Sequence, residues 1–145
     1  MAAQAGTSKI TRAFFDTNVL VCSDDPASPE KQKRAIDLIQ VHRLDRSGVI
    51  SIQVLQEYFV ASTKKLGLDP GFAKSKVEVW ARFQVVEPGV GDVLAAIDLH
   101  RLSGVSFWDA LIVRCAKEAG CSVLLSEDMQ HGQAIDGVRI TNPFI

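Results

Sequence analysis

Cysteine is scarce in the 145-residue sequence, which contains only Cys22, Cys115 and Cys121. The number is odd and no two of them have C-x-x-C spacing, which argues against a disulfide framework and against a zinc site. Two of the three lie within apolar runs. We therefore expect reduced thiols, located mainly in the core.

An excess of charge of one sign is also missing, because the formal net charge is −1. A chain with so little net charge has no overall field that would attract nucleic acid. Contact with RNA would have to use local basic groups, although solvated helix faces are the more common role of such groups. Three groups occur: Lys31, Lys33 and Arg34; Lys64 and Lys65; and Lys74 and Lys76.

Long hydrophobic runs are absent as well, since none approaches the roughly 18 apolar residues that a membrane helix needs. The stretch from Met1 to Thr11 has no apolar signal segment, and we expect a frayed leader there. With 47% hydrophobic residues, the remainder can bury a core of its own, and no linker composition divides it. The sequence predicts one domain over residues 12–145 in a soluble, cytoplasmic protein with no membrane segment.

Short apolar segments alternate with longer segments of helical periodicity along the chain. We predict buried strands at 13–15, 48–50, 84–86, 123–125 and 138–140, and helices at about 30–43, 52–66, 70–82, 90–102 and 107–119. This alternation is typical of a parallel sheet covered on both faces. The predicted fold class is α/β, a three-layer sandwich in which helices flank a central parallel sheet of about five strands.

Two acidic residues come directly after predicted strands. Asp16 follows the first strand, and Asp128 follows the fourth within three residues. In open parallel sheets, ligands bind beyond the carboxyl ends of the strands, where the strand order reverses. We expect Asp16 and Asp128 to lie together at that edge.

Two further acidic residues lie on predicted helices. Glu57 sits among apolar side chains at positions 52, 54, 55, 58, 59, 60 and 61, a pattern that indicates a helix buried nearly all round. Asp109 shares a helix face with Ile112, Val113 and Ala116 rather than with the polar stripe of its helix. Both carboxylates are therefore predicted to point into the protein.

Buried carboxylates need a cation, several hydrogen-bond donors or a proton, because an unpaired one costs several kcal/mol. Neither helix offers an obvious basic partner for its acid on the same face. A hard divalent cation shared by Asp16, Glu57, Asp109 and Asp128 would satisfy all four. Ligation by oxygen alone favours Mg²⁺ or Mn²⁺ over zinc.

Each acid also has a structural interpretation. Asp109 could complete a capping box opened by Ser106, and Asp16 with Thr17 and Asn18 could simply form a turn into a helix. Glu57 could pair with a lysine from elsewhere in the fold. Asp128 could be an exposed loop residue, as most loop acids are. The joint placement of the four at one sheet edge favours the shared site.

Four segments carry a family resemblance. Residues 14–20, FFDTNVL, resemble the opening D-T-N-x-L motif of PIN domains, and residues 51–57 resemble their strand-then-helix segment with an inward Glu. Residues 107–112, FWDALI, are similar to the family's aromatic-Asp-Ala helix start. Residues 124–129, LLSEDM, are similar to its acidic loop after the fourth strand. The order and spacing match from Arg12 to the end.

The resemblance implies a metal-dependent endoribonuclease that hydrolyses RNA phosphodiester bonds and leaves a 5′ phosphate and a 3′ hydroxyl. Asp16 and Asp109 would be direct ligands of Mg²⁺ or Mn²⁺, whereas Glu57 and Asp128 could act through water. Thr17, Asn18 and Ser126 would hold these carboxylates or bound waters, or would serve only as turn caps.

Among PIN proteins, the short single-domain form of this chain looks like the VapC-type toxins of bacterial toxin–antitoxin pairs. This likeness implies a small antitoxin protein as partner, and self-association into a homodimer or a higher homo-oligomer. Apolar residues of one short helix, Phe72, Val77, Val79 and Trp80, exceed what a single buried face requires and would suit either contact.

The remaining aromatic and histidine residues are not needed for this chemistry. His42 and His100 fall near helix ends, where a histidine can meet terminal carbonyls. His131 lies in a loop near Asp128, where it could touch a phosphate, although a surface role is favoured. Trp80 and Trp108 are interpreted as core or interface residues rather than base-stacking platforms.

Two other functions compete with the nuclease. A phosphatase of the haloacid dehalogenase type needs a second acid two residues after the first, where this chain has Asn18. The other is a catalytically inactive PIN-like domain that binds RNA or protein, against which the presence of all four acids argues.

Overall fold

The computed structural model describes residues 11–145, so the expected leader lies outside the described residues apart from Thr11. One sheet has the strand order β3-β2-β1-β4-β6-β5. Its strands are β1 (Ala13–Phe15), β2 (Gly48–Ser51), β3 (Gln84–Val86), β4 (Val123–Leu125), β5 (Ala134–Ile135) and β6 (Val138–Thr141). All five predicted strands are present, and they pair in parallel.

The sixth strand, β5, is not predicted by the sequence pattern, and it pairs antiparallel with β6. Asp136 and Gly137 connect the two, with φ of 51° and 85°. Positive φ at both central residues is the signature of a tight type I′ hairpin turn, for which Asp-Gly is a favoured sequence. Two residues are too few to show alternation, so only the Asp-Gly pair marks this hairpin in the sequence.

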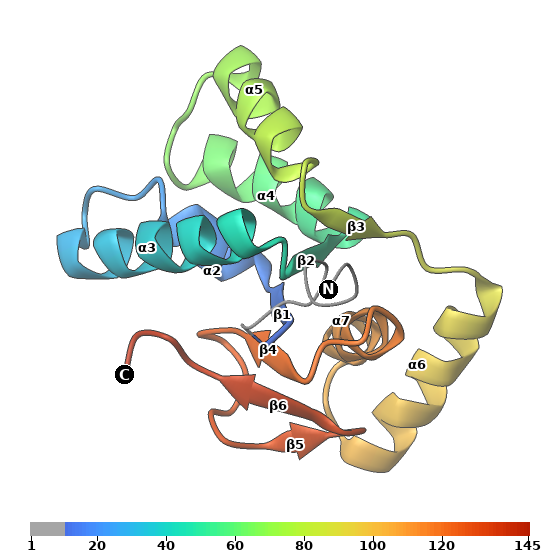
Figure 1. The fold of residues 1–145 in the computed structure, drawn as a ribbon. Coiled ribbons are helices and arrows are strands. Elements are labelled where there is room, and N and C mark those ends of the chain that lie inside the picture. The colour runs from blue at the N-terminus through green and yellow to red at the C-terminus, as the bar shows by residue number, and fades with distance from the viewer. Residues whose placement is uncertain (1–10) are drawn as a thin grey trace, which may run out of the picture.

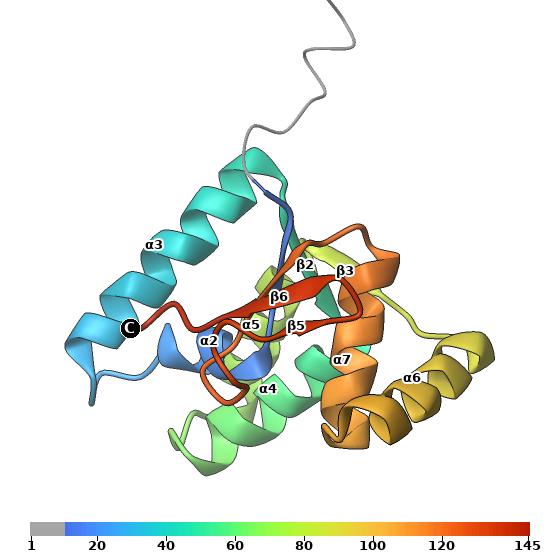
Figure 2. The ribbon, with the colours of Figure 1, turned by 90° about the horizontal axis from the view of Figure 1, so that it is seen from below.

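Helices lie on both faces of the sheet, which confirms the three-layer prediction. Figure 2 shows α3 (Pro29–Asp45) on one side of the strands, and α7 (Phe107–Glu118) with α6 (Val90–Ser103) on the other. In Figure 1, α4 (Ile52–Lys64) and α5 (Pro70–Trp80) lie above the sheet and pack together. Ser51 caps α4 by accepting a hydrogen bond from Val54 N.

Two predictions about the helices need correction. The six-residue helix α2 (Thr17–Cys22) is absent from the predicted elements, because it is too short to show a period. Helix α4 is not buried all round, since Phe59 and Val60 are exposed and only Val54, Tyr58 and Ser62 are fully buried. Among residues 11–145, no element covers Phe59 and Val60 fully, and periodicity alone cannot reveal whether one does.

The core is built from the strands and from the inner faces of the helices, with single contributions such as Trp80 from α5 and Ala96 from α6. Phe14, Phe15, Leu20, Ile50 and Tyr58 are among its largest fully buried side chains. The described part of the chain has no helix that is both long and apolar enough to cross a membrane. All three cysteines are free, with Cys115 and Cys121 buried and Cys22 half-buried.

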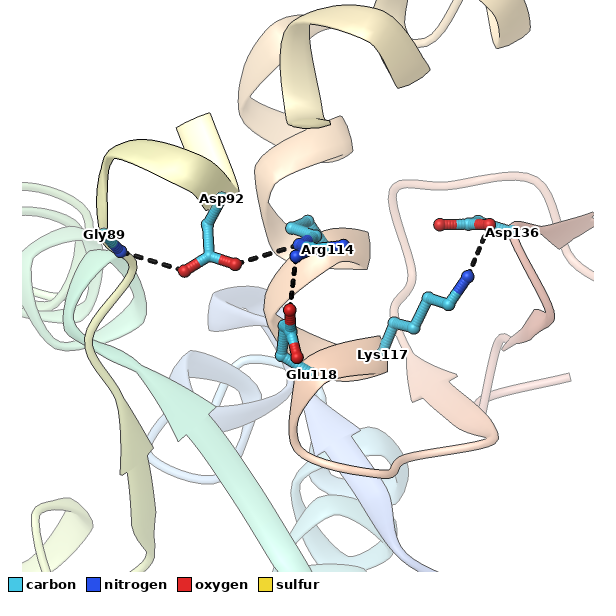
Figure 3. Close-up of polar contacts among 6 residues, drawn as sticks. All are labelled: Gly89, Asp92, Arg114, Lys117, Glu118 and Asp136. Atoms are coloured by element: carbon cyan, nitrogen blue, oxygen red, sulfur yellow. Dashed lines mark hydrogen bonds and ion pairs between the residues drawn. The ribbon is translucent and has the colours of Figure 1, made fainter. Parts of the chain in front are cut away.

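A polar network joins α6 to α7 (Figure 3). Asp92 accepts a hydrogen bond from Gly89 N at 2.9 Å and another from Arg114 Nε, also at 2.9 Å. Arg114 further contacts Glu118 on its own helix. The amide of Gly89, followed by the Arg114 guanidinium, lowers the pKa of Asp92. One carboxylate thus caps α6 and ties it to α7.

We expect Asp92→Ala to lower the free energy of unfolding by about 1–2 kcal/mol, because it removes both a helix cap and an ion pair. Asp92→Asn keeps an acceptor for Gly89 and should cost less than about 1 kcal/mol. The contribution of Asp92 is present above its unfolded pKa and disappears as pH falls through its lowered folded pKa. The free energies of unfolding of the parent and the Ala variant, measured by urea unfolding, should therefore approach each other as pH falls below the ordinary pKa of Asp. A difference that stays constant with pH would contradict this role.

Candidate functional site

The candidate site lies where the strand order reverses. The chain runs outward from β1 to β2 and β3, and then returns to place β4 on the other side of β1. Phe15 pairs with Leu125, so Asp16 and Ser126 are the first residues beyond two adjacent parallel strands. Crevices at such switch points are where open α/β sheets bind ligands. The backbone alone therefore brings Asp16 and the 126–128 loop together.

Asp16 is a buried carboxylate, only 8% exposed. One oxygen, Oδ1, accepts from Thr17 N at 2.8 Å, which makes Asp16 the N-cap of α2. The other, Oδ2, accepts from Ser126 Oγ at 2.8 Å. Burial raises the pKa of Asp16 to about 6, although both hydrogen bonds lower it, and the charges of Glu57 and Asp109 add to the rise.

Asn18 connects the two strand ends. Its Nδ2 amide lies 3.3 Å from Asp16 Oδ2 and 3.2 Å from Asp128 Oδ2, and its Oδ1 accepts from Glu127 N at 3.0 Å. Ser126 Oγ also accepts from Asp128 N at 3.3 Å. These donors hold the carboxylates of Asp16 and Asp128 on one side of the site. The capping interpretation of Asp16 is thus correct, and it does not exclude a role in the site.

Glu57 faces the site from the middle of α4. Thr17 Oγ1 donates to Glu57 Oε1 at 2.7 Å, and Gln53 Nε2 donates to Oε2 at 3.2 Å. The prediction that Glu57 is a buried carboxylate is wrong, because this residue is exposed on the uncovered side of α4. Its side chain is nevertheless held in place by one donor on each oxygen.

Asp109 belongs to the first turn of α7 and is half-buried. Ser106 Oγ accepts from Asp109 N at 3.1 Å, so the predicted cap at Ser106 is present. Burial raises the pKa of Asp109, the Ser106 hydroxyl lowers it, and the charges of Asp128 and Glu57 raise it further. The charge of Glu57 thus contributes to the raised pKa of both Asp16 and Asp109, and the charge of Asp128 contributes to that of Asp109.

All four acids line a single open cleft of about 860 Å³. Helix α4 supplies one wall, and α2 with the segment after it, α7 and the loop after β4 supply most of the rest. Asp25 and Glu127 also line the cleft, which therefore contains six acidic side chains and two basic ones, Lys64 and Lys65. Such a cleft can attract cations and repels an anionic substrate unless its charge is offset.

The fit to a metal ion depends on how many protein ligands the ion requires. Among residues 11–145, no three His, Cys, Asp or Glu side chains already form a metal-binding group. A closed structural site of the zinc kind, which needs four such ligands already gathered, is therefore not found among these residues. Mg²⁺ is commonly bound by one or two carboxylates, with water and substrate phosphates completing its shell. The donor set, all carboxylate oxygens from different elements, fits Mg²⁺ or Mn²⁺ bound in that way.

Histidine plays no part in the cleft. The buried His42 ring lies within hydrogen-bond distance of Ser47 Oγ, at 2.7 Å, and the His100 ring contacts Val105 O. The His131 ring accepts from Asn142 N at 2.9 Å in an exposed loop, which agrees with a surface role. Trp80 is in the core at 3% exposed, whereas Trp108 is 60% exposed and cannot be a core residue.

Gln53 is the residue that sequence reasoning missed. Besides donating to Glu57, it has a buried carbonyl oxygen without a hydrogen-bond partner among the described residues. Its position four residues before Glu57, on the same helix face, is the only sequence signal that could have identified it.

The chain was compared with models of known protein families and with curated proteins. A family model for the PIN domain matches residues 13–134. The search of curated proteins finds no match. Residues 13–134 include all four acids of the cleft, and they cover most of the chain.

Several solved structures have a similar fold at low sequence identity. A toxin–antitoxin complex from Klebsiella pneumoniae gives a TM-score of 0.68 at 16% identity and covers 90% of this chain and 97% of that chain. VapC20 of Mycobacterium tuberculosis, described as a sarcin-ricin loop cleaving toxin, gives 0.66 at 17% identity, covering 80% and 89%. DNA-bound VapBC from Salmonella typhimurium gives 0.67 at 18%, covering 92% and 99%.

We expect Asp16→Asn to stabilise the metal-free protein at neutral pH. The folded pKa of Asp16, about 6, exceeds its ordinary value of 3.8, so the folded state binds more protons in this window and stability falls as pH rises through it. About two pKa units correspond to an upper limit of about 3 kcal/mol, from which weakened contacts to Ser126 subtract. In thermal melts with chelator, the melting temperature of Asp16→Asn should exceed that of the parent at about pH 7.5, and the difference should vanish near pH 4.

Asp98→Asn, which removes an exposed carboxylate of α6, is the control and should show no such pH-dependent gain. A melting temperature for Asp16→Asn well below that of the parent in chelator would instead mark Asp16 as a cap and nothing more.

Proposed function

Because the chain belongs to the PIN domain family, we propose that it is an endoribonuclease that hydrolyses RNA phosphodiester bonds with the aid of Mg²⁺ or Mn²⁺. One observation carries the proposal: Asp16, Glu57, Asp109 and Asp128 come from four separate segments and line the same cleft at the switch point. We take residues 12–145 to be one nuclease domain.

The four acids have different surroundings, which suggests different roles. Asp16 and Asp109 have pKa values raised by burial, so a bound cation relieves the largest penalty there, and we assign them as direct ligands. Glu57 and Asp128 are exposed and can bind through water. When bound, the metal ion would supply an activated water and offset negative charge on the phosphate.

The supporting residues fix the carboxylates for this role. Thr17 and Gln53 each donate to one oxygen of Glu57, so the side chain can orient an attacking water without rotating. Asn18 and Ser126 hold Asp16, and Asn18 also holds Asp128, which keeps two charged groups close despite their repulsion. Loss of these donors should loosen the site rather than the fold.

The proposal predicts that purified protein cleaves RNA with Mg²⁺ or Mn²⁺, stops in excess chelator and is not rescued by Zn²⁺. Asp16→Asn and Asp109→Asn should each lower the cleavage rate at least a hundredfold, since removal of a key electrostatic group at such a site costs roughly 10²–10³ in rate. Cleaved RNA should carry a 5′ phosphate and a 3′ hydroxyl, which adaptor ligation and end sequencing would detect.

Asp98→Asn serves as the matched control, because it makes the same substitution on α6 outside the cleft and should retain parental activity. Full activity in chelator would overturn the metal mechanism. If the parent binds RNA but cleaves none under any metal condition, the chain is an inactive PIN-like binding domain.

We further propose that the chain is the toxin of a bacterial toxin–antitoxin pair, acts in the cytoplasm and self-associates. Support comes from the described roles of its structural neighbours and from uncovered apolar surface. A groove of about 520 Å³ between α4 and α5 is bordered by Leu55, Phe59 and Val77, and Phe72 nearby is 54% exposed. Trp80, assigned from the sequence to this surface, belongs to the core instead.

Expression of the chain alone should arrest bacterial growth, and co-expression with the small protein encoded beside it should restore growth. Phe59→Asp combined with Phe72→Asp should weaken that rescue while leaving RNA cleavage intact, because both side chains lie outside the acidic cleft. Growth that is unaffected by a cleavage-competent protein would contradict the toxin assignment.

A further inference from the structure

The three groups of basic residues in the sequence differ in the contacts that they form in the structure. Lys31 contacts Glu127, Lys33 pairs with Asp37, and Lys76 pairs with Asp24 at 3.2 Å. Arg34 donates to Pro143 O at 3.0 Å. These contacts account for most of the first and third groups as internal or surface pairs.

Lys64 and Lys65 differ from them in two ways. Neither has a carboxylate within ion-pair distance among residues 11–145, and both are exposed. Both also line the acidic cleft, and within the described part of the chain they are the only basic side chains that do. Two free cations therefore stand in the one place where the surroundings are otherwise acidic.

Helix α4 connects these lysines to the acids. The side chains that α4 and its C-cap contribute to the cleft are Gln53, Gln56, Glu57, Val60, Ala61, Lys64 and Lys65. Their spacing is that of one continuous helix face. Lys64 lies seven positions after Glu57, which is two helical turns, or about 10 Å along the helix. The cleft thus has an acidic end and a basic end on the same wall.

This polarity matches the needs of a polyanion held across an acidic centre. A metal ion can offset charge only on the phosphate next to it, whereas the flanking phosphates of the strand would meet further acidic side chains of the cleft, of which Glu127 is already in contact with Lys31. Proteins that hold single strands do so with a basic groove that follows the backbone. Among residues 11–145, Lys64 and Lys65 are the basic side chains of the cleft that can serve that purpose.

We propose that Lys64 and Lys65 bind the phosphate backbone of a single-stranded RNA segment and set the direction in which it crosses the cleft, along α4 from the acids to its carboxyl end. The proposal rests on the proposed nuclease function. The two lysines are positioning residues, because they act on phosphates that flank the scissile one. Their contacts carry no sequence information and should affect all RNA sequences alike.

The test measures binding of a fluorescein-labelled, mixed-sequence, single-stranded RNA 12-mer in the Asp109→Asn background with Mg²⁺, at several NaCl concentrations. The slope of log Kobs against log [NaCl] is negative, and each phosphate contact on a single strand contributes about 0.7 to its magnitude. Lys64→Gln/Lys65→Gln should therefore make the slope less steep by about 1.4. In the parent background, the same pair should raise KM for cleavage with a smaller change in kcat.

Lys33→Gln/Arg43→Gln is the matched control, because it removes two charges from the exposed face of α3, away from the cleft. Lys64→Arg/Lys65→Arg should restore the parental slope. Equal slopes for the cleft pair and the α3 pair, in a protein that cleaves RNA, would overturn the lysine assignment alone. A changed salt slope in a protein that cleaves no RNA would support RNA binding by Lys64 and Lys65 and would reject the nuclease function.

Discussion

The structure depends on one constraint, the burial of the Asp16 carboxylate between two parallel strand ends. Phe15 and Leu125 pair in register, so the chain cannot close the sheet without placing Asp16 against Ser126. Burial makes that carboxylate costly, and the donors Thr17, Asn18 and Ser126 offset only part of the cost. The first turn of α2 and the loop after β4 are both organised around the same two oxygens.

The other acids increase this cost rather than relieve it. Glu57 and Asp109 raise the pKa of Asp16, and Asp128 and Glu57 raise that of Asp109. A fold selected for stability alone would gain by replacing one of them. Their presence in one cleft is explained if a divalent cation binds there, because the cation converts the shared repulsion into shared attraction. In the proposed function, Lys64 and Lys65 at the far end of α4 would then provide the positive charge that an RNA strand needs.

The sequence was sufficient to predict features that follow from strand ends. Residues 13–15 and 123–125 are continuous apolar runs, and these runs alone assign Asp16 and Asp128 to the carboxyl edge of the sheet. The exposure of Glu57 could not be predicted, because the apolar pattern around it does not tell which side of α4 another element covers. Helix α2 and strand β5 are shorter than the windows in which a period can be recognised. The amide contact of Gln53 depends on a side-chain orientation that sequence does not encode.

The most direct test of the shared metal site is the anomalous scattering of Mn²⁺ in crystals of the full chain, soaked at a concentration that supports RNA cleavage. We expect an anomalous peak inside the cleft, in contact with the carboxylates of Asp16 and Asp109. This peak should be absent from crystals of Asp16→Asn. Manganese bound only outside the cleft, or no bound manganese in crystals of cleavage-competent protein, would contradict it.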